Sequence, residues 1–134
     1  MRPTLLDSDT LTLLNKAHPL VNAHATLYIQ QFGHLVFSEF NYYEVTRGLK
    51  AAGAAAQLAR FEAFCQAHRM LPFSREAAAI AADIWATLKR GGQLIGEIDV
   101  LIAGVALREG LAVATRNASH FERIAGLTIV DWTV

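Results

Sequence analysis

One apolar segment constrains the fold of this chain more than any other. Residues Ile95–Ala106 read IGEIDVLIAGVA, and Asp99 stands among apolar residues at helical spacing. A helix of this composition is buried on most sides, and burying an ionised carboxylate there is costly unless a cation or hydrogen-bond donors compensate it. We therefore expect Asp99 to lie at a cleft or against a positive charge. The simpler interpretation is a first-turn aspartate, which the helix dipole favours by about 0.3–1 kcal/mol.

The composition predicts one soluble domain over residues 1–134, long enough for a real core. Hydrophobic residues make up 53% of the chain and charged residues 18%. Charges interrupt every apolar stretch before the roughly 18 residues that a membrane span needs. A secretion signal has an uninterrupted apolar run near its start, whereas Asp7 and Asp9 interrupt the first apolar run of this chain. We therefore expect a cytoplasmic protein without membrane association. Cys65 is the single cysteine, which excludes an internal disulfide and a cysteine-based metal cluster.

The charge balance bears on possible nucleic-acid partners. Twelve basic and twelve acidic residues cancel, so the chain lacks the global positive field of a general nucleic-acid binder. A nucleic-acid substrate would need a local basic rim. The chain offers five candidates for such a rim: Arg47, Lys50, Arg108, Arg116 and Arg123. Spare apolar residues also suggest a protein partner or self-association.

Short apolar runs alternate with helical patterns along the whole chain. Strands are predicted at Thr4–Leu6, Leu35–Phe37, Met70–Phe73, Leu111–Thr115 and Leu127–Val130. Helices are predicted from near Leu11, over Pro19–Gly33, from Ser38 to about Gly53, over Ala54–His68, from Ser74 to Gly91, and over the apolar segment as far as Gly110, with a polar turn at Arg116–Glu122. This alternation indicates an α/β fold, with a largely parallel central sheet flanked by helices. Ligands of such sheets bind beyond the carboxyl ends of the strands.

Four polar residues occupy comparable places in this pattern. Asp7 follows the first strand, Glu44 lies on the helix after the second, Asp99 is near the start of the apolar helix, and Asn117 follows the strand Leu111–Thr115. Carboxylates brought together raise one another's pKa, so such a cluster is stable mainly when divalent cations hold it. Hard oxygen ligands suit Mg²⁺ or Mn²⁺. A metal of this kind polarises a phosphodiester and activates a water molecule, which predicts a phosphodiester hydrolase.

At these residues the chain resembles the PIN-domain family, and specifically its VapC-type toxins. The matching pieces are LLDSDTL, YYEVTRGL, IGEIDVLIA, TRNASHFERIAGL and a terminal IVDW, in the family's order and over nearly the whole chain. The resemblance implies a single PIN-like domain that acts as a metal-dependent endoribonuclease. It also implies an RNA substrate, a small cognate antitoxin protein that inhibits the enzyme, and a homodimer.

The resemblance assigns roles residue by residue. The family's acidic metal ligands match Asp7, Glu44 and Asp99, and Asp9 matches a polar position beside the metal. Many PIN domains have an aspartate at the fourth position, where this chain has Asn117, with His120 three residues later. Asparagine can ligate a cation or hold a water molecule, but it adds no charge. A second tightly bound metal is therefore not implied.

Several of these residues also have simpler interpretations. Asp9 could only cap a helix that starts near Leu11. Glu44 could pair with Arg47 three residues on, a contact worth about 0.2–0.5 kcal/mol on an exposed helix. The simpler interpretation of His120, a turn or packing residue, is favoured over a ligand.

Thr115 and Arg116, which precede the fourth position, also have two interpretations each. Thr115 and Arg116 could contact a substrate phosphate. They could equally be the end of a strand and a surface charge. The sequence leaves both interpretations open, and it assigns these residues no direct contact with a metal.

Three other functions compete with the nuclease interpretation. Asp7-Ser8-Asp9 has the D-x-D shape of haloacid-dehalogenase-like phosphatases, but the chain lacks a late acidic pair and a well-placed lysine among Lys16, Lys50 and Lys89. A receiver domain needs an aspartate after the third strand, where Ser74 and Arg75 stand. A catalytically silent PIN-like binding module would keep the acidic residues without a metal, which is destabilising.

Overall fold

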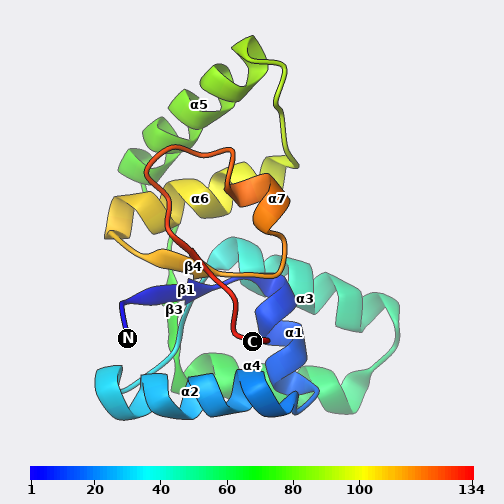
Figure 1. The fold of residues 1–134 in the computed structure, drawn as a ribbon. Helices are drawn as coiled ribbons and strands as arrows, with labels where there is room; N and C mark the ends of the chain where they lie inside the picture. Colours follow the sequence, from blue (N-terminus) through cyan, green and yellow to red (C-terminus); the bar gives the residue numbers. More distant parts are fainter.

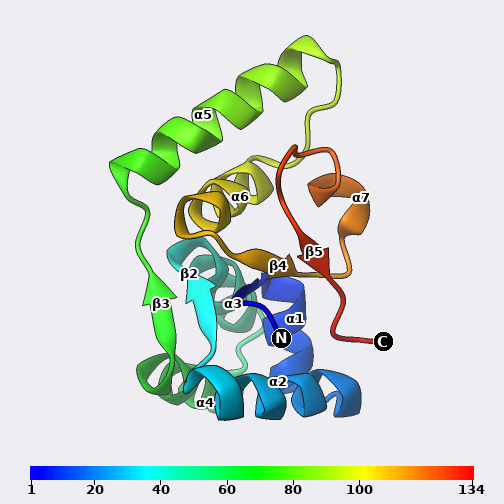
Figure 2. The same ribbon diagram turned by 60° about the vertical axis from the view of Figure 1, so that its left-hand side comes forward.

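Parallel strands lie at the centre of the computed structural model, which describes residues 1–134. One sheet has the order β1 (Thr4–Leu6), β4 (Ala112–Ala114), β5 (Ile129–Val130), and a second pairs β2 (Val36–Ser38) with β3 (Arg69–Leu71). The helices are α1 (Ser8–Asn15), α2 (Pro19–Phe32), α3 (Glu39–Ala51), α4 (Ala55–Ala67), α5 (Arg75–Arg90), α6 (Glu97–Glu109) and α7 (Ala118–Phe121). The strands lie between a layer with α5, α6 and α7 and a layer with α2 and α4 (Figure 1, Figure 2). The predicted α/β fold with parallel strands is confirmed, although its hydrogen-bonded ladder is divided into two sheets.

Alternating side chains along the strands separate two buried clusters. Leu5 and Val113 belong to the cluster that includes α5 and α6, while their neighbours Leu6 and Ala114 belong to the cluster that includes α2 and α4. Successive side chains of a strand point to opposite faces, so β1 and β4 each contribute to both clusters. The apolar helix α6 lies over one face, and Ile102 on it is fully buried. No helix combines the length and the apolar composition needed to cross a membrane.

Helices α5 and α6 pack closely against each other at one glycine. A Cβ atom added to Gly104 of α6 would lie 2.7 Å from the Ala77 carbonyl oxygen and 2.9 Å from the Ala81 Cβ atom of α5. Only glycine allows the backbones of α5 and α6 to approach this closely. This contact sets the position of α6, which carries Asp99, relative to α5.

Most helix ends fall where the capping residues predict them. Ser38 caps α3 by accepting the Asn41 N–H at 3.3 Å, and Ser74 caps α5 by accepting the Ala77 N–H at 3.1 Å. Gly110 ends α6 in the left-handed conformation, with a φ of 68°. These local signals set the lengths of the helices that carry the acidic residues.

Two local predictions were wrong. The first helix begins at Ser8 rather than near Leu11, because Asp7 caps it and accepts the Ser8 N–H at 2.8 Å. The predicted polar turn Arg116–Glu122 contains the short helix α7, which buries Phe121 completely. The gain from burying one large aromatic side chain explains why a polar segment becomes helical.

Candidate active site

Asp7 stands at the carboxyl end of β1 and is only 5% exposed. Its Oδ1 atom accepts the Ser8 N–H at 2.8 Å, and its Oδ2 atom accepts the Thr115 hydroxyl at 2.9 Å. The pKa of Asp7 is raised to about 6, mainly because the carboxyl is buried, and the nearby charges of Asp99 and Glu44 contribute to the rise while the two hydrogen bonds oppose it. The fold therefore holds an aspartate whose charged form is unfavourable without a positive partner.

Glu44 reaches the same place from α3. Its Oε1 atom accepts the Ser8 hydroxyl at 2.6 Å, and its Oε2 atom lies 3.7 Å from the Arg47 guanidinium. The predicted pair with Arg47 therefore exists. It does not exclude a role for Glu44 in the acidic cluster, because Ser8, the residue that follows Asp7, donates a hydrogen bond to the same carboxylate. Glu44 thus contacts both its own helix and the first residue of α1.

Asp99 lies in the first turn of α6 with its side chain 17% exposed. Its Oδ2 atom is 2.9 Å from His120 Nδ1 and 3.4 Å from Asn117 Nδ2. Asn117 Nδ2 also lies 2.9 Å from His120 Nδ1, so the three side chains form one contact group. The fold brings His120 to the site, although the sequence favoured a turn or packing role for it.

Asp9 and Arg116 form the only bidentate ion pair of the site. Arg116 donates from Nε at 3.0 Å and from a terminal nitrogen at 2.6 Å to the two carboxylate oxygens of Asp9. These hydrogen bonds hold the pKa of Asp9 below its usual range. Asp9 is therefore neither the helix cap nor a free carboxylate, and it contacts the residue that directly follows Thr115.

Sequence reasoning missed Asn41 and Ser8. Asn41 is completely buried, and its amide nitrogen donates to Ser8 Oγ at 3.1 Å and to Asp7 Oδ1 at 3.4 Å. Its oxygen accepts the Ser38 N–H at 2.8 Å and the Ser38 hydroxyl at 2.6 Å. The spacing Ser38-x-x-Asn41 in the first turn of a helix was the available signal, because it is the pattern of a capping box. Asn41 connects the cap of α3 to Asp7 and, through Ser8, to Glu44.

These residues line one open, polar cleft of about 600 Å³. Its walls carry no hydrophobic residue and comprise Asp7, Ser8, Asp9, Glu44, Asp99, Arg116 and Asn117. Thr115 is buried behind the cleft, where its hydroxyl accepts the Asn117 N–H at 2.9 Å. Asp99 thus lies at a cleft, as its sequence context predicts. No group of three or more His, Cys, Asp or Glu side chains is close enough together to hold a metal ion.

Comparison with known proteins identifies the family of this fold and cleft. The PIN domain model matches residues 4–127. The chain belongs to the PIN-domain family. The relatives of this PIN domain include a VapC ribonuclease of Sinorhizobium fredii, 34% identical over 134 residues and covering 95% of each chain. They also include a tRNA(fMet)-specific endonuclease VapC of Salmonella typhimurium, 39% identical over 83 residues, which are 62% of this chain and 63% of the relative.

A solved VapBC structure has the same fold as this PIN domain. The structure of DNA-bound VapBC from Salmonella typhimurium contains a chain that superposes with a TM-score of 0.88 at 31% identity, covering 98% of this chain and 99% of that one. The resemblance to VapC-type PIN domains that the motifs predict is confirmed. The individual roles of Asp7, Glu44, Asp99 and Asn117 stay predictions.

Proposed function

We propose that this PIN domain is a VapC-type endoribonuclease toxin that hydrolyses RNA phosphodiester bonds with Mg²⁺ or Mn²⁺, and that residues 1–134 form one functional unit. The observation that carries the proposal is the polar cleft, where Asp7, Glu44, Asp99 and Asn117 meet from separate elements. The match to a VapC ribonuclease over 95% of both chains supports RNA as the substrate. Membership of the PIN family argues against the phosphatase and receiver alternatives.

The side chains of the cleft fit a hard divalent cation. Asp7, Glu44 and Asp99 offer the oxygen atoms, of which one or two carboxylates would contact the ion directly, and the raised pKa of Asp7 indicates a buried carboxylate that lacks a positive partner. Mg²⁺ is usually held by one or two carboxylates while water completes its shell, so a looser arrangement than a three-carboxylate cage suffices. When bound, such an ion supplies Lewis acidity and a water molecule of lowered pKa.

The remaining side chains of the cleft orient the acidic ones. Ser8 and Thr115 fix the two oxygens of Asp7, and Ser8 also holds Glu44. Asn117 lies beside Asp99 and would position a water molecule or a substrate oxygen through its neutral amide. Arg116 stands at the wall of the cleft, where its guanidinium would meet a phosphate of the RNA in exchange for Asp9.

The proposal includes a small antitoxin protein, self-association as a homodimer and action in the cytoplasm. The solved VapBC complex from Salmonella typhimurium supports an antitoxin partner. Co-expression with the adjacent small gene product should relieve growth inhibition and yield a co-purifying complex. Growth inhibition that persists, without any complex, would contradict the toxin–antitoxin assignment.

A cleavage assay separates the enzyme from a catalytically silent binding module. The purified protein should cut a mixture of cellular RNAs in the presence of Mg²⁺ or Mn²⁺, and an excess of EDTA should stop the reaction. Intact RNA after incubation with either ion would favour the binding module instead.

The fourth position can be tested by a short series of variants. Asn117→Asp should strengthen Mg²⁺ or Mn²⁺ binding by adding an anionic ligand, while Asn117→Ala should weaken it and slow cleavage by about tenfold or more. His120→Ala should have a much smaller effect. The concentration of metal that gives half-maximal cleavage checks all three variants. A damaging His120→Ala with a silent Asn117→Ala would move the fourth site to His120 and favour a softer transition metal.

A further inference from the structure

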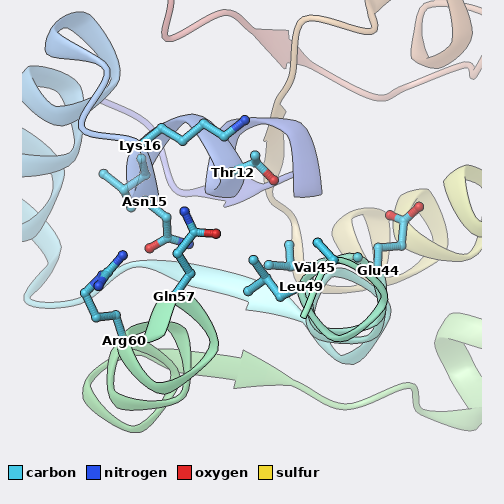
Figure 3. Close-up of a pocket in the computed structure, with 11 residues that line it drawn as sticks. Thr12, Asn15, Lys16, Glu44, Val45, Leu49, Gln57 and Arg60 are labelled. Carbon is cyan, nitrogen blue, oxygen red and sulfur yellow. The ribbon is translucent and has the colours of Figure 1, made fainter. Parts of the chain in front are cut away.

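We propose that a second cleft next to the acidic one binds the RNA strand that flanks the scissile phosphate; this inference rests on the proposed function. The flanking cleft measures about 460 Å³ and lies between α1, α3 and α4. Its polar lining includes Thr12, Asn15, Lys16, Glu44, Gln57 and Arg60. Figure 3 shows Asn15 of α1 beside Gln57 of α4, Lys16 with its side chain extended along α1 toward Thr12, and Glu44 at the opposite side from Arg60.

The flanking cleft is continuous with the acidic cleft through Glu44, which lines both. On α3, Gly48 and Ala52 follow Glu44 at helical spacing and also line the flanking cleft. Eight helical residues rise about 12 Å, so this face of α3 leads from the acidic residues toward the basic ones. An RNA strand with its scissile phosphate at Glu44 would have to leave along such a path on one side.

Charge favours RNA as the occupant. At the acidic cleft the two nearby arginines are already paired, Arg47 with Glu44 and Arg116 with Asp9. Lys16 and Arg60 line the flanking cleft and form no salt bridge. Affinity for nucleic acid depends mainly on cations that neutralise phosphates. The flanking cleft thus offers cations that can meet a phosphate without first giving up a carboxylate partner, as Arg116 of the acidic cleft would have to do.

The rest of the lining suits a nucleotide. Val45 and Leu49 provide an apolar wall, and the amides of Asn15 and Gln57 can both donate and accept hydrogen bonds. Proteins recognise single-stranded RNA by packing against the faces of bases and by hydrogen bonds to their edges. The volume falls within the roughly 300–1,000 Å³ that is usual for ligand sites. We infer that Lys16 and Arg60 contact phosphates and that the amides contact a base.

A first experiment removes the free charges. The double variant Lys16→Gln with Arg60→Gln is compared with a control double variant, Lys89→Gln with Arg90→Gln. Lys89 and Arg90 are exposed at the end of α5, so the control removes the same amount of charge outside the cleft. The probe is a fluorescein-labelled single-stranded RNA of random sequence, and its Kd is measured in EDTA by anisotropy. We expect the Kd of the cleft variant to rise at least tenfold and the slope of log affinity against log salt to fall by about 1.4, at about 0.7 per contacted phosphate. The control variant should bind within twofold of the unchanged protein.

A second experiment blocks the flanking cleft by volume. Gly48 lines the cleft, and a Cβ atom added there would meet no other atom within 4 Å, so Gly48→Leu should fold normally. Ala59→Leu, on an exposed position of α4 outside the cleft, adds a comparable side chain as control. In Mg²⁺, Gly48→Leu should raise KM for RNA at least fivefold while kcat changes less than twofold. Ala59→Leu should change neither constant.

Unchanged Kd and KM in both cleft variants would overturn the proposal. So would variants that keep RNA binding but lose the complex with the antitoxin, since the cleft would then belong to a protein partner. The proposed function fails differently, through an unchanged protein that does not cleave RNA at all. The two proposals can therefore be judged separately.

Discussion

Replacing Asp99 with asparagine should abolish RNA cleavage, with a loss of at least about 100-fold, because even residues that only support metal ligands typically cost 10–100-fold. The fold should stay intact or become more stable. Asp99 shares the cleft with Asp7 and Glu44, and removing one of these charges lowers their mutual repulsion. Asparagine keeps the shape of the side chain and can still contact His120 and Asn117. Initial cleavage rates in Mg²⁺ and unfolding by urea test both effects.

The matched control for this variant is Glu97→Gln. Glu97 lies in the same first turn of α6, but it is exposed and does not line the cleft. Glu97→Gln removes one negative charge from the same end of α6 as Asp99→Asn does. Comparing the two variants therefore separates the loss of Asp99 from a general effect on the helix dipole. Cleavage at the unchanged rate by Asp99→Asn in Mg²⁺ would show that the central assignment is wrong.

Asp7→Asn should stabilise the metal-free protein at neutral pH by up to about 3 kcal/mol, from a pKa difference of roughly two units at 1.36 kcal/mol per unit. Burial raises the pKa of Asp7 in the folded protein to about 6 from its usual 3.8. Between these values the folded state binds more protons than the unfolded state, so stability falls as the pH rises from about 4 to about 6. Asparagine carries no charge, so Asp7→Asn does not lose stability over this pH range.

Urea unfolding in EDTA at pH 4 and at pH 7 measures this effect. The difference between Asp7→Asn and the unchanged protein should be small at pH 4 and near its full size at pH 7. Asp83→Asn, at an exposed position of α5, should show no such difference. A stability difference that does not depend on pH would contradict a raised pKa for Asp7. The variant should also lose RNA cleavage, so stability and activity would change in opposite directions at one residue.

Sequence alone predicted the architecture and most of the polar residues that line the cleft, although not Ser8. Alternating apolar runs predicted parallel strands, and Pro19, Ser38, Ser74 and Gly110 marked helix ends that the structure confirms. These signals are local, because a cap or a period depends on residues a few positions apart. Parallel strands carry their carboxyl ends to one edge of the sheet, which is why the order of Asp7, Glu44, Asp99 and Asn117 sufficed to predict a common cleft.

Only the tertiary structure decided how these residues are partnered. Asp9 contacts Arg116 across 107 positions of sequence, and Asp7 contacts Thr115 across 108. The buried link through Asn41 also depends on α1 packing against α3, which brings Asn41 to Asp7 and Ser8. No local period encodes which of several distant polar side chains will meet. The raised pKa of Asp7 likewise follows from burial by the whole fold, because desolvation depends on every atom packed around the carboxylate.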